Sequence, residues 1–151
     1  MKKSRISRED MNCDIEIEFE NKKIKLRAII DTGNFLKDPI TKMPVVVVES
    51  KALTEIIPKK MLENLQEILY NNELELGEYA SKIRIIPFTS LGKENGLLVG
   101  IKIDEIKVYY DDEIEEIKNV ILGIYNGTLS KSNKYSALIG IGLLEDYSRR
   151  C

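Results

Sequence analysis

The sequence predicts a single, mainly β domain with one helical insertion. Most of its regular segments either alternate apolar and charged residues or are rich in β-branched residues, and both patterns are typical of strands. One sizeable stretch, residues 51–72, has the apolar spacing of a helix instead. Strands and helices do not alternate, which argues against a doubly wound fold. The length of 151 residues fits one domain with its own core.

Three strands are expected in the first third of the chain. Residues 14–19 read D-I-E-I-E-F, a strict alternation that indicates a half-buried strand, and residues 24–30 form a second strand that ends in A-I-I. Residues 31–34, D-T-G-N, interrupt the pattern with turn-forming residues. After an irregular loop at 35–44, the β-branched run at 45–48 predicts a strand buried on both faces.

The helical insertion follows this buried strand. Ser50 is a plausible N-cap, and the chain then has apolar residues on one face as far as Pro58. Beyond Pro58, the spacing predicts one amphipathic helix packed on the sheet. Its apolar positions are Met61, Leu62, Leu65, Ile68 and Leu69.

The second half of the chain returns to strands. An Asn95-Gly96 pair between two of them favours a hairpin. The acidic residues 111–116 are expected to join two further strands as a solvated hairpin end, and residues 143–150 are expected to form a short C-terminal helix. The strands are expected at residues 83–89, 97–103, 106–110, 120–125 and 137–139.

Composition excludes several classes of function. The chain has no histidine, which rules out Ser-His-Asp triads, Cys-His dyads and histidine zinc sites. Its two cysteines, Cys13 and Cys151, are too few for a cysteine zinc site, and the acidic cluster lacks a metal-binding loop pattern. We therefore expect no metal and no cofactor. A net charge of -2 gives no basic field for nucleic acid.

The chain as given is expected to be soluble and cytoplasmic. It has no apolar run long enough to cross a membrane, and its charged opening is unlike a signal peptide. We divide it into a basic tail or linker, residues 1–12, and one domain, residues 13–151.

Asp31-Thr32-Gly33 is the one triplet with clear chemical potential. Asp31 directly follows the apolar strand end A-I-I, so its carboxylate is expected at the border of the core with backbone donors around it. Such a setting suits a carboxylate that holds or shares a proton. The alternative is an ordinary turn in which the aspartate caps the bend and Gly33 supplies a positive φ.

The far end of the chain adds a second pattern. Residues 137–144 read A-L-I-G-I-G-L-L, an apolar strand with a glycine end before a helix. The order of apolar strand, D-T-G, glycine-tipped hairpin and this element resembles retropepsin-type aspartic proteases. This resemblance implies a closed retropepsin-like β-barrel, with the 83–103 hairpin as the flap. Gly140 and Gly142 would then support the active site.

A longer string gives a closer resemblance. Residues 28–49, A-I-I-D-T-G-N-F-L-K-D-P-I-T-K-M-P-V-V-V-V-E, are similar to the active-site segment of the sporulation sigma-E factor processing peptidases. Residues 86–96 resemble the proposed flap of that family. The resemblance implies a membrane-associated aspartic protease whose membrane-spanning N-terminal half is absent from this chain. It would act at the cytoplasmic face of the mother-cell membrane.

The same resemblance implies the partners and the reaction. The substrate would be an inactive sigma factor precursor that loses its N-terminal pro-sequence after a signalling protein from the forespore acts. Two carboxylates must face each other over one water. Because the chain has one D-[S/T]-G, a homodimer with Asp31 from each chain is expected.

The resemblance also assigns roles around Asp31. The Thr32 hydroxyl would hold the two active-site loops in register, and Gly33 would permit close backbone approach. Where retropepsins carry Arg and then Asn or Asp, this chain has Ile141 and Gly142. The residues expected to shape the substrate cleft or flap are Asn34, Phe35, Leu91, Gly92 and Gly96.

Other functions remain open from sequence alone. The fold could serve as a non-catalytic binding or dimerisation module in which Asp31 only forms a turn. It could also be a stand-alone aspartic protease with a different peptide substrate. A lysine-based enzyme is a third alternative, although most lysines occupy solvated, alternating positions.

Overall fold

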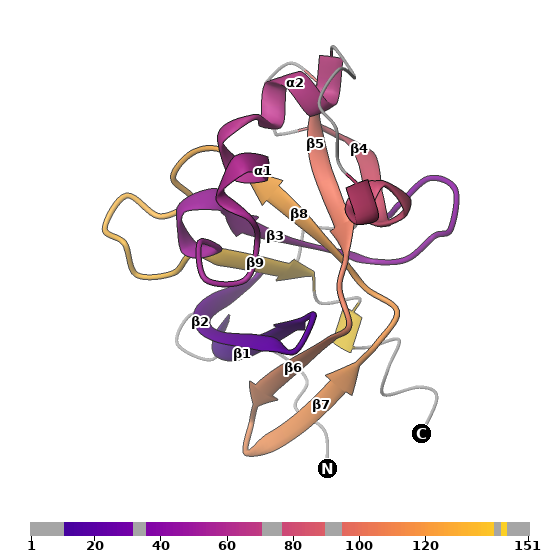
Figure 1. The fold of residues 1–151 in the computed structure, drawn as a ribbon. Helices are drawn as coiled ribbons and strands as arrows, with labels where there is room; N and C mark the ends of the chain where they lie inside the picture. Colours follow the sequence, from indigo (N-terminus) through magenta and orange to yellow (C-terminus); the bar gives the residue numbers. More distant parts are fainter. Residues whose placement is uncertain (1–10, 32–35, 71–76, 90–94, 141–142, 145–151) are drawn as a thin grey trace.

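A computed structural model describes residues 11–31, 36–70, 77–89, 95–140 and 143–144 of the chain. The described part is mainly β, as predicted, and contains a nine-stranded sheet in the order β4-β5-β8-β3-β9-β2-β1-β6-β7 (Figure 1). The strands are β1 Asn12–Phe19, β2 Lys22–Asp31, β3 Val45–Glu49, β4 Ile83–Thr89, β5 Asn95–Lys102, β6 Glu105–Tyr110, β7 Glu113–Ile117, β8 Ile121–Tyr125 and β9 Ala137–Gly140.

The sheet of the described residues is open, so the prediction of a closed β-barrel is wrong. Strands β4 and β7 form its two ends, and each pairs with one neighbour, β5 and β6 respectively. Closure needs a pairing between the two end strands, which lie at opposite ends of the molecule in Figure 1. Pairings of that kind join distant parts of the chain, and alternation within each strand does not determine them.

The β1–β2 hairpin closes with a two-residue turn. Glu20 and Asn21 both have positive φ, 52° and 67°, as a two-residue type I′ turn requires. The strands then pair from Phe19 with Lys22 to Asn12 with Ile29. On its other side β1 pairs with β6, so β1 is an interior strand.

Strand β3 is buried on both faces, which confirms the prediction from its β-branched run. All five of its residues are buried. It pairs in parallel with β8 and antiparallel with β9. Val46 and Val48 join the main core, whereas Val45 and Val47 join a second, smaller apolar cluster on the other face.

The insertion covers the main-core face of the sheet, but it contains two short helices rather than one. Helices α1, Lys59–Glu63, and α2, Leu65–Tyr70, are separated at Asn64. The Asn64 side-chain amide donates to the Lys60 carbonyl at 2.7 Å. In a continuous helix, the Lys60 carbonyl would accept the backbone amide of Asn64. The Asn64 side chain takes that position instead, so the helix breaks here. Short 3₁₀ helices, η2 Ser50–Ala52 and η3 Gly77–Lys82, flank the pair.

Strand β7 is the element that the sequence interpretation missed. Asp111 and Asp112 both have positive φ and form the two-residue turn between β6 and β7. Residues 111–116 were expected to form a solvated hairpin end, yet residues 113–117 pair with β6. Glu113 and Glu116 are exposed, whereas Glu115 is half-buried and Ile117 is buried. No helix in the described part of the chain is long and apolar enough to cross a membrane.

Candidate active site

Asp31 is the last residue of β2 and lies beside Gly140, the last residue of β9. The two strands run parallel, with Ala28 next to Ala137 and Asp31 next to Gly140. The structure therefore brings together two of the elements singled out by sequence, because the carboxyl ends of parallel neighbours meet at one edge of the sheet.

The carboxylate stands at the border between the core and solvent. Ile30 and Ile139, the residues just before this pair, are 1% and 0% exposed, whereas Asp31 is half-buried. Ala28 and Ala137 are fully buried one step further back. The packed strands thus fix the backbone of Asp31, the residue at which β2 ends.

Several predicted site residues lie outside the described part of the chain. These are Thr32, Gly33, Asn34 and Phe35 after Asp31, Leu91 and Gly92 in the hairpin, and Gly142 after β9. Of the predicted C-terminal helix at 143–150, the described residues are Leu143 and Leu144, which are helical and buried.

The predicted hairpin forms from β4 and β5, which pair from Ile83 with Ile101 to Thr89 with Asn95. Gly96 lies within this ladder opposite Phe88. A Cβ atom built on Gly96 would lie 2.7 Å from Cε1 of Phe88, so the glycine makes room for that ring. In the order of the sheet, β8, β3 and β9 separate this hairpin from β2.

The loop that follows the Asp31 segment is held by a buried aspartate that sequence analysis did not single out. Asp38 is 2% exposed. Its carboxylate accepts the Thr41 hydroxyl at 2.6 Å and the Thr41 amide at 3.2 Å. Its own amide donates to the Met43 carbonyl at 2.9 Å. A D-P-x-T string is a turn signal that could have revealed this arrangement.

Asp38 also links this loop to the hairpin. Nε of Arg84, on β4, lies 3.9 Å from Oδ2 of Asp38, and the Arg84 side chain is further held by the Ser81 and Ile83 carbonyls. The Thr41 hydroxyl bond, the backbone amides of Thr41 and Ile40, and the Arg84 charge lower the pKa of Asp38, while burial opposes them. An ionised Asp38 thus positions the loop between Asp31 and β3.

This linkage predicts an acid-sensitive contribution to stability. The folded-state pKa of Asp38 lies below its ordinary value of 3.8. The stabilisation from the ionised Asp38 carboxylate is therefore complete above pH 3.8 and is lost as pH falls through the folded-state pKa. Replacing Thr41 by valine should lower the free energy of unfolding by about 1.5–3 kcal/mol at neutral pH, because a hydrogen bond to a charged group is removed. The penalty should shrink as pH falls below 3.8 and the Asp38 carboxylate becomes protonated.

Urea unfolding of wild type and Thr41→Val across this pH range measures both effects. Thr54→Val is a matched control, because Thr54 is exposed and its hydroxyl bonds to no described residue. Equal penalties for Thr41→Val at neutral and acid pH would contradict the role given to the Asp38 carboxylate.

A second buried carboxylate, Glu49, ends β3 on the other side of β9. It is 3% exposed and accepts the Leu129 amide at 2.6 Å, with Lys51 Nζ at 3.7 Å. Its backbone amide donates to the Ser136 carbonyl at 3.0 Å. Glu49 therefore holds the 126–136 loop that delivers β9 to its place beside β2. Among the described residues, no group of three or more Cys, Asp or Glu side chains could hold a metal ion.

Comparison with known proteins matches this chain to one family over nearly its whole length. A family model described as sporulation factor SpoIIGA matches residues 1–143. The sporulation sigma-E factor-processing peptidase of Priestia megaterium is 32% identical over 133 residues, which is 86% of this chain and 43% of the relative. The corresponding Bacillus subtilis protein is 25% identical over 129 residues, 83% of this chain and 42% of the relative.

A putative sporulation sigma factor-processing peptidase of Bacillus thuringiensis is 29% identical over 133 residues, 86% of this chain and 82% of the relative. The chain thus spans less than half of the Priestia and Bacillus subtilis proteins, but most of the Bacillus thuringiensis one. No solved structure matches the chain. The family match covers residues 1–143 and confirms the resemblance found in the Asp31 segment, so the chain belongs to the sporulation factor SpoIIGA family.

Proposed function

We propose that this chain is the protease domain of an aspartic endopeptidase that cleaves the N-terminal pro-sequence from a sporulation sigma factor precursor. The observation that carries the proposal is the placement of Asp31, which ends β2 beside Gly140 of β9. A carboxylate there is fixed by the packed ends of two paired strands and remains half-exposed to a substrate. The names of the relatives support the choice of substrate.

The reaction requires a second carboxylate, and we assign it to Asp31 of a second chain. One carboxylate, ionised, takes a proton from the attacking water, and the other, protonated, donates to the oxygen of the scissile carbonyl. A two-fold axis near the end of β2 brings them together, because an isologous dimer repeats the same contact on both chains.

The remaining assignments follow the order of parts in retropepsin-like proteases. Thr32 and Gly33 shape the active-site loop, and Gly140 and Gly142 support it from β9. The β4–β5 hairpin acts as the flap over an extended peptide, which pairs through its main chain. Asn34, Phe35, Leu91, Gly92 and Gly96 line the substrate cleft or flap. In the full-length protein, the domain lies at the mother-cell side of the membrane and awaits a signalling protein from the forespore.

Co-expression tests the proposal. The full-length gene, as wild type or as Asp31→Asn, is expressed with the sigma factor precursor, and shortening of the precursor is followed by immunoblot. We expect shortening with wild type and none with Asp31→Asn. Asp112→Asn, in the exposed turn between β6 and β7, is the matched control and should retain full activity.

All three proteins must be present at equal levels for the comparison to hold. Equal shortening by wild type and Asp31→Asn would exclude Asp31 as the catalyst and would return the D-T-G triplet to an ordinary turn. No shortening by wild type, with the precursor present and stable, would favour the non-catalytic module.

A further inference from the structure

Strand β2 has an unpaired edge at its N-terminal end within the described part of the chain. It pairs with β1 along nearly its whole length, but on the other side β9 pairs only with residues 28–31. The closing pair of a two-residue hairpin, here Phe19 with Lys22, is a hydrogen-bonded pair. The alternation that follows directs the amides and carbonyls of Lys23, Lys25 and Arg27 away from β1.

One backbone hydrogen bond agrees with this alternation. The Ser136 amide donates to the Arg27 carbonyl at 3.0 Å, at the point where the chain enters β9. Before that point, no described residue bonds to the outward main-chain groups of Lys23 and Lys25. Main-chain groups that lack a protein partner are almost always in contact with water. Because Lys23 and Lys25 are exposed, their outward amides and carbonyls are accessible to solvent. The free edge, residues 22–26, is long enough to take a short added strand.

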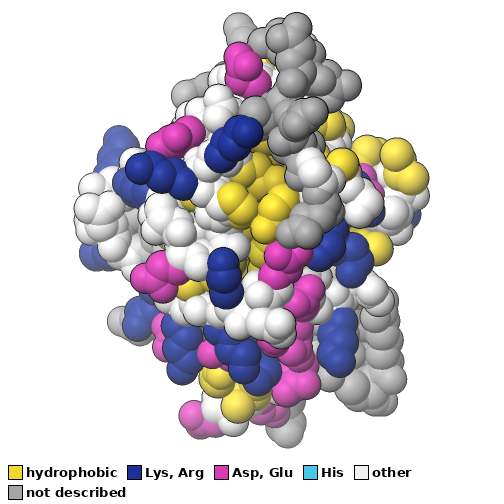
Figure 2. Space-filling view, in the orientation of Figure 1, with side chains coloured by type: hydrophobic (Ala, Val, Ile, Leu, Met, Phe, Trp, Pro, Cys, Tyr) yellow, Lys and Arg dark blue, Asp and Glu magenta, His cyan; other side chains and the backbone are white. Residues whose placement is uncertain are grey.

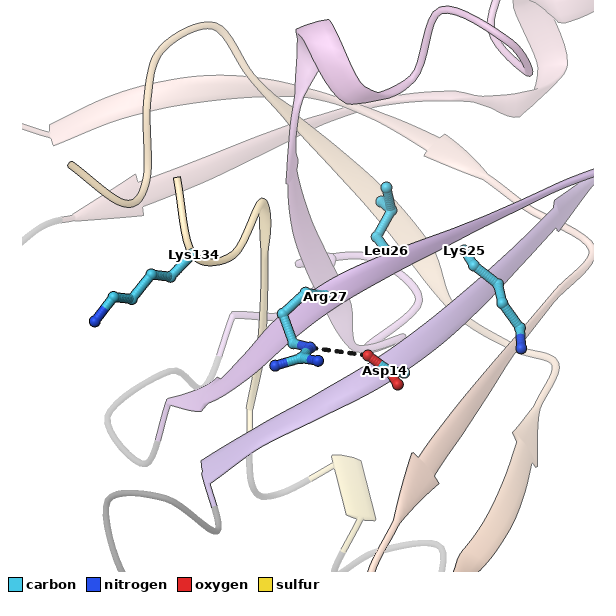
Figure 3. A pocket seen from close by; sticks show the side chains of 5 residues that line it. All are labelled: Asp14, Lys25, Leu26, Arg27 and Lys134. Carbon is cyan, nitrogen blue, oxygen red and sulfur yellow. Dashed lines mark hydrogen bonds and ion pairs between the residues drawn. The ribbon is translucent and has the colours of Figure 1, made fainter. Parts of the chain in front are cut away.

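The free edge is strongly basic. Lys22, Lys23, Lys25 and Arg27 are all exposed. In Figure 2, lysine and arginine side chains interleave with acidic ones over the lower strands of the molecule. Beside the edge lies an open hollow of about 480 Å³, lined by Asp14, Lys25, Leu26, Arg27 and Lys134 (Figure 3).

Donors remain available at this hollow. Arg27 uses Nε to bond Oδ1 of Asp14 at 2.9 Å, which leaves its two terminal nitrogens without an acceptor among the described residues. Lys134 lines the hollow from the loop before β9, with its side chain directed away from Arg27 in Figure 3, and its ammonium group has no described partner either. Lys25 differs, because its ammonium group lies 4.8 Å from the centre of the Tyr109 ring.

The molecule already contains a strand that fits β2. On the paired side, the acidic residues of β1 face the basic residues of β2 in register: Asp14 with Arg27, Glu16 with Lys25 and Glu18 with Lys23. Opposite charges across a strand pair are stabilising. A second copy of β2 at the free edge would instead set lysine against lysine, which is unfavourable. An acidic, alternating segment on the free side would place its carboxylates opposite the basic residues of β2, as β1 does on the paired side.

We propose that the free edge of β2, with the Arg27 and Lys134 hollow at its end, binds an extended acidic segment of a partner protein as an added strand. The segment pairs with the outward main-chain groups of Lys23 and Lys25, and a carboxylate reaches Arg27 and Lys134. The site is separate from Asp31, since a rise of about 3.3 Å per residue puts Lys23 roughly 26 Å away along β2. It does not depend on the proposed protease activity.

Amide hydrogen exchange, read by NMR on the 151-residue chain, tests the edge directly. In the free protein, the amides of Ile24 and Leu26, which bond to β1, should be protected, and those of Lys23 and Lys25 should exchange fast. The probe is a blocked peptide of sequence T-E-V-E-V-E-T. Saturation with this peptide should protect Lys23 and Lys25. Protection of these two amides before any peptide is added would overturn the proposal.

Variants separate the backbone and charge contributions to peptide affinity. Lys23→Pro removes an outward amide without breaking a bond to β1, so it should weaken binding about ten-fold relative to Lys23→Thr. Lys134→Glu should weaken binding about ten-fold, whereas Lys118→Glu, an exposed charge reversal in the turn after β7, should not. The peptide with Gln in place of Glu should not bind.

Three results would refute the proposed docking edge. They are no binding of the acidic peptide at millimolar concentration, equal binding of the glutamine peptide, or equal loss in Lys118→Glu and Lys134→Glu. If the lysines only guard the edge against self-association, Lys23→Thr should dimerise while acidic peptide binding is absent, and that result also counts against the proposal.

Discussion

Replacement of Phe19 by alanine is expected to lower the free energy of unfolding by about 3–5 kcal/mol, the range for truncating a buried aromatic side chain. Phe19 is fully buried at the end of β1, immediately before the two-residue turn. Its ring lies 6.0 Å from the Tyr79 ring, and Lys82 Nζ lies 5.1 Å from its centre. One substitution therefore removes core burial, an aromatic pair and a cation–π contact.

Loss of the Phe19 ring should also weaken the attachment of η3 to the β1–β2 hairpin. Lys82 Nζ bonds Glu20 Oε2 at 3.0 Å, and the Tyr79 hydroxyl donates to Glu20 Oε1 at 3.3 Å. The Phe19 ring contacts both of the side chains that make these bonds, Tyr79 and Lys82. Because η3 leads directly into β4, the hairpin proposed as the flap should begin from a less fixed position in Phe19→Ala.

Urea unfolding followed by far-UV circular dichroism gives the free energies, and amide exchange in β4 reports the local effect. Tyr70→Ala is the matched control, because Tyr70 is an aromatic residue that is 62% exposed. It should change stability by no more than about 0.5 kcal/mol. If Phe19→Ala also changed the free energy of unfolding by no more than this amount, the end of the β1–β2 hairpin would not be part of the cooperative core.

The sequence predicts most strands correctly because their signals are local. Alternation in residues 14–19 and the valine run at 45–48 reflect burial of one face and of two faces, and both are found. The split of the helix at Asn64 is not predictable in this way, since the apolar spacing continues across it. It depends on one side-chain amide that competes for the Lys60 carbonyl.

The arrangement of the sheet is harder to predict. The parallel pairing of β2 with β9 joins residues from opposite ends of the chain, and it is this pairing that places Gly140 beside Asp31. Sequence order suggested both residues, but not that they lie in register. Whether the sheet closes depends on its two end strands, whose long-range placement no local pattern encodes.

The site shows the same division. Asp31 stands out as a candidate in the sequence because the D-T-G triplet directly follows an apolar strand end, and its catalytic role stays a prediction. Asp38 looks like an ordinary loop residue until folding brings Arg84 of β4 to within 3.9 Å of its carboxylate. A buried carboxylate needs such partners, and they come from a segment far along the chain.

A dominant-negative experiment tests the proposal that Asp31 acts from two chains. Asp31→Asn alone should lower the rate of precursor cleavage by at least about a thousand-fold, because it removes a group that handles the transferred proton. Mixed with wild type, the variant should also inactivate wild-type chains, since each active dimer needs both carboxylates. At constant total protein and equal amounts of the two full-length proteins, about one quarter of the activity of wild type alone should remain if dimers form at random.

A site completed within one chain gives a different dose response. Activity would then follow the wild-type fraction itself, with about one half remaining at equal amounts and about one tenth at a nine-fold excess of variant. The two-chain site predicts about one hundredth at that excess. Asp112→Asn is the matched competitor, because it has the same charge change in an exposed turn and should leave every mixture fully active. A linear dose response for Asp31→Asn would place the second carboxylate in the same chain and would remove the dimer from the mechanism.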